Sequence, residues 1–271
     1  MKRWKAPQKK TLRQIIKERD SARLVHYFLR LVVVLILIAQ VFNRNYENVF
    51  LCVLTLMLFA IPSLIETNTR IDIPDTLENI ILIFIFAAEI LGEMRSYYET
   101  VILWDTMLHT INGFLAAAIG FSLVDILNQN ERFSFRLEPI FVCIVAFCFS
   151  MTIGVIWEFF EFFMDMFFGT DMQKDTIIHV LHTTALDPTK TLRVVTVSDI
   201  QSVAVNGKDL GLGGYLDIGL IDTMKDLFVN FIGAVAFSIA GFFYLTYRAK
   251  KASFIERFIP TVVDKQQPEE E

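Results

Sequence analysis

The sequence predicts an all-α integral membrane protein, built as a six-helix transmembrane bundle with a long extracytoplasmic loop between the last two spans. Two observations predict this class. The chain has 271 residues, of which 54% are hydrophobic and 26 are Phe, and the apolar residues gather in runs of about 20, the length that crosses a bilayer as a helix. Lys and Arg concentrate near the two ends of the chain, where they act as orientation signals.

Six apolar runs are long enough to be interpreted as spans. The second is short and contains Pro62, and the third is diluted by Glu89 and Glu93. The spans are expected at 24–42, 49–65, 77–94, 101–127, 140–168 and 222–247. The chain then divides into a basic cytoplasmic segment at 1–23, spans one to five within 24–168, an extracytoplasmic cap loop at 169–220, span six within 221–247 and a cytoplasmic tail at 248–271.

The charge of the loops predicts the orientation of the spans. The first 23 residues and the stretch YRAKKASFIERF after the last span are both basic. An even number of spans places these two segments on one side of the membrane, and the positive-inside rule makes that side cytoplasmic. Arg132 and Arg136, in the loop after span four, add positive charge on the same side. Both termini are therefore predicted to be cytoplasmic.

The segment at 169–220 is too long to be a simple connection between helices. Its stretches TLRVVTV and SVAVNG alternate between apolar and polar residues, which predicts a short hairpin or a small sheet. We expect a partly ordered cap, because loops of this length are often functional lids. His179 and His182 are expected as a surface pair on a short helix, with ligation in the membrane site as the alternative.

Polar residues recur at helical spacing inside three of the apolar runs. In GVIWEFFEFFMD of span five, the three acids have i, i+3, i+7 spacing and share one helical face. An ionised side chain at such a depth costs roughly 2.5–3.5 kcal/mol by insertion scales, so its presence predicts a function. The stripes are Asp105, His109 and Gly113 on span four, with Asn112 adjacent, then Glu158, Glu161 and Asp165 on span five, and Asp222, Asp226, Asn230 and Gly233 on span six. Of these, Asn112, Asp165, Asp222 and Asn230 are expected as supporting polar residues of the site.

The predicted orientation places all three stripes in the extracytoplasmic half of the membrane, because each lies at the outer end of its span. Several carboxylates close together need a shared proton or a bound cation. Imidazole nitrogen with carboxylate and amide oxygens suits a divalent ion such as Mg, Mn, Ca or Zn. We predict His109, Glu158 and Asp226 as ligands of such an ion. The predicted catalytic residues are Glu158, Glu161 and Asp105, with Glu161 or Asp105 as the general base.

Structural roles are the alternative for each of these residues taken alone. Asp105 and Asp222 begin their spans and could act as helix caps or partners of the helix dipole. His109 could be a hydrogen-bonded histidine of the bundle, and Asn230 could join two helices. A proton relay among the carboxylates and the histidine is the alternative to a bound ion.

The motifs WDTMLHTINGF, GVIWEFFE and DTMKDLFVNFIGA resemble the YjdF-type family of bacterial inner-membrane proteins and, more distantly, the VanZ-like membrane proteins. On the VanZ-like pattern His109 matches an early His, Glu158 and Glu161 match a late Glu/Gln pair, and Asp226, Asn230 and Gly233 match a closing D-x-x-x-N-x-x-G. The resemblance implies a multi-pass protein of the bacterial cytoplasmic (inner) membrane that acts in cell-envelope chemistry.

The leading functional hypothesis is a membrane protein with an acidic, divalent-cation-binding site that acts on a lipid-linked or envelope-derived substrate. If it is an enzyme, hydrolysis or group transfer on a phospho- or acyl-lipid is the expected reaction class, and membrane lipid is the expected partner. The alternatives are a proton- or ion-coupled transporter or flippase that uses the same carboxylates, and a non-catalytic structural protein. Nucleic-acid binding is not expected, because the basic segments are short.

Overall fold

A computed structural model describes residues 12–68, 71–129, 137–247 and 254–262. The first eleven residues, Arg132 and Arg136, and most of the predicted cytoplasmic tail lie outside these ranges. Much of the charge pattern that predicts the orientation therefore also lies outside the described residues. The chain divides into two compact units, residues 1–154 with 229–271, and residues 155–228.

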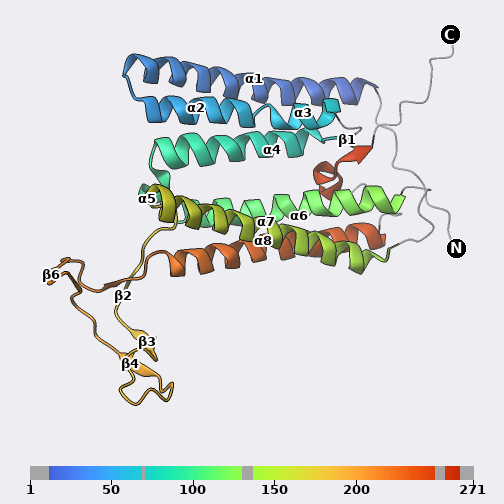
Figure 1. The fold of residues 1–271 in the computed structure, drawn as a ribbon. Helices are drawn as coiled ribbons and strands as arrows, with labels where there is room; N and C mark the ends of the chain where they lie inside the picture. Colours follow the sequence, from blue (N-terminus) through green and yellow to red (C-terminus); the bar gives the residue numbers. More distant parts are fainter. Residues whose placement is uncertain (1–11, 69–70, 130–136, 248–253, 263–271) are drawn as a thin grey trace, which may run out of the picture. The chain divides into compact units, whose positions relative to one another are not determined.

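Helices make up all of the long elements (Figure 1). They are α1 (Leu12–Phe42), α2 (Tyr46–Leu58), α3 (Ile61–Asn68), α4 (Asp75–Phe86), the π-helix η1 (Ala87–Met94), α5 (Tyr97–Thr100), α6 (Trp104–Gln129), α7 (Pro139–Phe168), α8 (Leu220–Tyr247) and the 3₁₀-helix η2 (Phe254–Phe258).

Five helical segments of the described residues are long and apolar enough to cross a membrane: Leu24–Phe42, Tyr46–Asn68, Trp104–Asn128, Pro139–Phe168 and Leu220–Tyr247. The predicted third span at 77–94 is not among them, because it is divided between α4, which has 12 residues, and η1, which has 8. An all-α membrane protein is thus supported with five candidate spans, while the predicted third span, at 77–94, stays a prediction.

The first three long helices, α1, α2 and α4, pack side by side (Figure 1). Their contact contains Val33, Cys52 and Leu82, each fully shielded from solvent. Arg30 of α1 donates from Nη2 to the Phe59 carbonyl over 3.3 Å, at the break between α2 and α3. This bond gives a donor to a backbone carbonyl at the break. The break lies close to Pro62, which has no N–H to donate to the Leu58 carbonyl four residues earlier.

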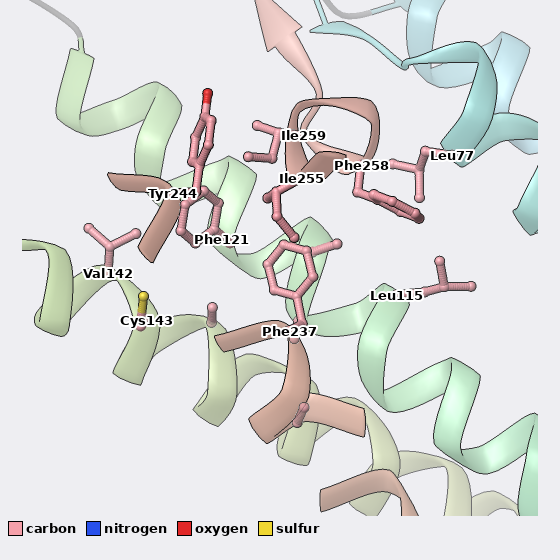
Figure 2. Close-up of a cluster of buried hydrophobic side chains, with 14 of the residues drawn as sticks. Leu77, Leu115, Phe121, Val142, Cys143, Phe237, Tyr244, Ile255, Phe258 and Ile259 are labelled. Atoms are coloured by element: carbon pink, nitrogen blue, oxygen red, sulfur yellow. The ribbon is translucent and has the colours of Figure 1, made fainter. Parts of the chain in front are cut away.

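A second core joins α4, α6, α7 and α8 to the segment after α8 (Figure 2). The 3₁₀-helix η2 inserts Ile255 and Phe258 into this core, and both are buried. Beyond it, β8 (Thr261–Val262) pairs antiparallel with β1 (Ile71–Asp72), which precedes α4. The segment after span six is therefore part of the packed fold over residues 254–262.

The unit at 155–228 holds the second half of α7, the long loop and the first turns of α8. Its strands form antiparallel pairs: β2 (Ile177–Ile178) with β7 (Tyr215–Leu216), β3 (Leu181–Thr183) with β4 (Val195–Val197), and β5 (Ala204–Val205) with β6 (Lys208–Asp209). The prediction that His179 and His182 lie on a short helix is wrong. His182 lies in β3, and His179 precedes that strand with Nδ1 2.9 Å from the Ile200 carbonyl oxygen.

Candidate functional site

The first turns of α6 contain a carboxylate and an imidazole in contact. Asp105 and His109 are one turn apart, and Nε2 of His109 lies 3.4 Å from Oδ1 of Asp105. The imidazole is buried and the carboxylate is half-buried. A carboxylate beside one ring nitrogen fixes the orientation of the ring, as carboxylates that accept a hydrogen bond from metal-binding histidines do. This pair is the part of the predicted site that α6 supplies.

Further along the same helices, polar groups join α6, α7 and α8. Asn112 donates from Nδ2 to Oδ1 of Asn230 over 3.3 Å, and Asn230 is 1% exposed. Ser150 of α7 donates from Oγ to the Gly113 carbonyl over 2.7 Å. Nδ2 of Asn230 also lies 3.5 Å from the Ser150 carbonyl oxygen. Asn112, Gly113, Ser150 and Asn230 thus connect the three helices through polar contacts.

Glycine allows the helices to approach this closely. A Cβ atom at Gly113 would collide with the Asn230 carbonyl oxygen, and one at Gly233 would collide with the Thr110 carbonyl oxygen. At Gly154 the added atom would lie 2.7 Å from Nδ2 of Asn230. Helix contacts through small residues and side-chain amides are typical of membrane bundles. Asn112 and Asn230, which were predicted as site residues, therefore also pack the helices against one another.

Ser150 and Gly154 were not among the predicted site residues. Both lie one helical turn apart on α7, and Glu158 follows after another turn. This i, i+4, i+8 spacing of small and polar residues inside an apolar run was the available signal. It continues the acidic face of span five toward the middle of the helix.

The unit at 155–228 contains the buried carboxylates of α7 and α8. Glu158 is 4% exposed and Asp226 is 1% exposed. Glu161 is also buried, and its Oε1 accepts a hydrogen bond of 2.7 Å from Nε1 of Trp157 in the preceding turn. Burial of an acid within an apolar helix requires hydrogen bonds, a proton or a cation, so all three remain candidates for site chemistry.

Asp165 and Asp222 instead hold the backbone of the long loop. Asp165, near the end of α7, accepts from the amides of Met172 and Gln173 over 2.7 and 2.8 Å. Asp222, in the first turn of α8, accepts from the amide of Lys174 over 2.8 Å. These bonds favour structural roles for both acids, which were predicted as supporting polar residues of the site.

Asp217 completes this anchorage and was not among the predicted site residues. Its carboxylate accepts from the amides of Thr176 over 2.7 Å and of Ile221 over 2.9 Å, so it caps the start of α8. Burial raises the pKa of Asp217, but the hydrogen bonds from these backbone amides outweigh burial and hold its pKa below the ordinary value. The loop is thus joined to both helices that flank it.

The predicted site residues form two groups within the units. Asp105 contacts His109, and Asn112 contacts Asn230, in the unit formed by 1–154 and 229–271. The other acids belong to the unit at 155–228. His109 in the first unit and Asp226 in the second are both buried, and each has a side chain that can ligate a metal ion.

These features define a multi-pass helical membrane protein with acidic, imidazole and amide groups inside apolar helices. Residues 25–247 match the family described as "Predicted membrane protein (DUF2238)", and the chain belongs to this family. The YjdF-type resemblance fits this family, while the VanZ-like resemblance stays a prediction.

A curated relative from Thermotoga maritima, described as an uncharacterized protein, is 27% identical over 104 residues. The match covers 38% of this chain, and the chain spans about half of the relative, 52% of its length. No solved structure matches the chain.

Proposed function

We propose that this protein binds a divalent cation within the membrane through His109, Glu158 and Asp226, and acts on a lipid-linked or envelope-derived substrate. The observation that carries the proposal is the Asp105–His109 contact inside an apolar span, with a nitrogen-to-oxygen distance of 3.4 Å. A carboxylate that orients a histidine is a frequent feature of metal sites. We place this protein in the bacterial inner membrane, with both termini cytoplasmic and the site in the extracytoplasmic half.

The charges of the ligands explain why a cation would stabilise the site. Glu158 and Asp226 are buried carboxylates, and a buried carboxylate is stable when it is protonated, paired or bound to a metal. One neutral imidazole with two carboxylates makes a neutral complex with a divalent ion. Such mixed nitrogen and oxygen ligation suits Zn or Mn better than an all-oxygen site would.

The reaction class follows from what a bound cation supplies. A divalent ion polarises a carbonyl or phosphoryl oxygen and helps to generate a nucleophile from water, which suits hydrolysis or group transfer on a phospho- or acyl-lipid. Glu161, oriented by Trp157 over 2.7 Å, and Asp105 are the candidate general bases. Glu158→Gln is then expected to abolish turnover while expression stays normal.

Elemental analysis of the detergent-purified protein tests the proposal directly. We expect about one divalent ion per chain in the wild type, and loss of this ion in His109→Ala and Asp226→Asn because each removes a ligand. His182→Ala is the matched control, since His182 is an exposed histidine of the loop. A wild-type protein that purifies without stoichiometric metal, or a His109→Ala variant that keeps it, would contradict the proposal.

The alternative function is transport of a proton or ion, and one observation favours it. Nδ1 of His26 on α1 lies 3.5 Å from Oε1 of Glu78 on α4, and both residues begin their predicted spans on the cytoplasmic side. A transport path needs polar groups at both ends of the bundle, and the predicted polar stripes of spans four to six lie at the outer end alone. Uptake by proteoliposomes under a pH gradient, with loss in Glu78→Gln, would favour transport over catalysis.

A further inference from the structure

An open groove of about 500 Å³ runs between α7 and α8 in the unit formed by 1–154 and 229–271. Its walls are almost wholly apolar, and Ser238 supplies the one hydroxyl among the lining side chains. The volume falls within the range of small-molecule sites, roughly 300–1,000 Å³. Lining residues include Ile140, Cys143 and Phe147 on α7, and Phe231, Val235 and Phe243 on α8.

The groove lies entirely within two candidate membrane spans, so hydrocarbon surrounds it. At one end, the rings of Phe147 and Phe231 meet edge to face with centroids 5.4 Å apart. At the other end, Ile140 follows the first residue of α7, and Phe243 lies one turn before the last residue of α8. The groove therefore begins near a membrane surface and ends at an aromatic contact inside the bilayer.

The length of the groove matches one leaflet. Phe231 and Phe243 are twelve positions apart on α8, which is roughly 18 Å at about 1.5 Å per residue. Ile140 and Phe147 are seven positions apart on α7, or roughly 10 Å. Half of a hydrocarbon core is roughly 15 Å thick. An alkyl chain that enters from the surface would thus reach the Phe147–Phe231 contact at about mid-membrane.

We propose that this groove binds one acyl chain of a membrane phospholipid, held against α7 and α8 within a single leaflet. The apolar lining matches an alkyl chain, and with one hydroxyl, that of Ser238, and no charged side chain it suits a charged or strongly polar ligand poorly. Exposed side chains of both helices, such as Ile144 and Ile239, continue the same apolar surface outward to the lipid. The groove shares no residue with the proposed cation site, and this proposal does not depend on that function.

Lipid retention by the purified full-length protein tests the proposal. The probe is native mass spectrometry after extraction from bacterial membranes in a mild detergent. We expect one phospholipid to remain on the wild type and to be lost from Val235→Trp, because the indole would fill the groove. Ala236→Trp is the matched control: Ala236 neighbours Val235 on α8 but is exposed and does not line the groove. Its lipid should remain.

A second variant and a second measurement guard against misfolding of Val235→Trp. Ser238→Leu fills the groove with a smaller side chain, and it should reduce retention at least several-fold with an unchanged elution volume. A phospholipid with a photoreactive acyl chain should label residues 140–147 or 231–243 in the wild type and in Ala236→Trp. Equal retention by all variants, no retained lipid on the wild type, or a lipid-free dimer through this face would each overturn the proposal.

Discussion

Glycine at position 113 sets the distance between two helices of the bundle. The added Cβ of an alanine would collide with the Asn230 carbonyl oxygen, which is backbone and cannot rotate away. We therefore expect Gly113→Ala to lower the free energy of unfolding by about 1–3 kcal/mol, as overpacking does. Reversible unfolding in mixed micelles measures this change in the free energy of unfolding. Ala236→Val, at an exposed position of α8, should change stability little, and equal effects of the two substitutions would contradict the close packing.

The amide contact between Asn112 and Asn230 predicts a measurable coupling. Nδ2 and Oδ1 of the two side chains are 3.3 Å apart, and hydrogen bonds between membrane helices contribute about 0.6 kcal/mol on average, with about 1.7 kcal/mol as a maximum. A double-mutant cycle with Asn112→Ala and Asn230→Ala should return a coupling in this range. Strictly additive effects would show that the two amides do not stabilise the bundle through each other.

Contacts between site residues could be predicted from the sequence where the residues are spaced one helical turn apart. Asp105 and His109 were expected to share a face because they are four positions apart, and they are in contact. Ser150 escaped prediction because a lone serine in an apolar run is usually bonded to its own helix. Its bond to the Gly113 carbonyl depends on how two helices approach each other, which spacing within one helix does not reveal.

At the scale of elements, the loop between α7 and α8 owes its order to acids that accept backbone amides. Asp187 is an example, since the side chain and backbone of Thr189 and the amides of Arg193 and Thr191 all donate to it. The hydroxyl and the amide of Thr189 contribute most, and together these bonds lower the pKa of Asp187 to about 2.

This low pKa predicts how the turn at Asp187 responds to acid. Because the folded pKa of about 2 lies below the ordinary value of 3.8, the ionised carboxylate stabilises the turn fully above pH 3.8. That stabilisation is lost as the pH falls through about 2. Titration of the Asp187 carboxyl by NMR measures this folded-state pKa. Thr189→Val removes the hydroxyl and should raise the pKa toward its ordinary value; an Asp187 that titrates near 4 in the wild type would contradict the network.

The third predicted span shows where hydropathy alone falls short. Residues 77–94 form one apolar run, but the backbone changes from α4 to the π-helix η1 at Ala87. Hydropathy averages over the run and does not register such a change, which depends on local hydrogen bonding. Glu89 and Glu93, which dilute the run, both lie in η1. The all-α class followed from the apolar runs, whereas the helix boundaries depended on packing.

At the scale of the whole molecule, the segment after α8 was the least predictable part of the fold. Its sequence FIERFIP is short, charged and next to a basic stretch, so it was assigned to a cytoplasmic tail. In the structure, Ile255, Phe258 and Ile259 belong to the main hydrophobic core (Figure 2). These three residues have the i, i+3, i+4 spacing of one helical face, but the stretch is too short for periodicity to predict a buried helix. Only contacts distant in sequence show that it is buried.

This packing yields the final prediction. Phe258 is 5% exposed and meets Phe114 of α6 edge to face, with centroids 5.4 Å apart. Phe258→Ala should therefore lower the free energy of unfolding by about 3–5 kcal/mol, as deletion of a buried aromatic ring does. Phe50→Ala is the matched control, because Phe50 on α2 is 65% exposed and its loss should cost about 0.5 kcal/mol or less. Thermal unfolding in detergent compares the two. If both variants unfold alike, residues 254–262 do not hold the bundle together, and the segment behaves as the tail that its sequence suggested.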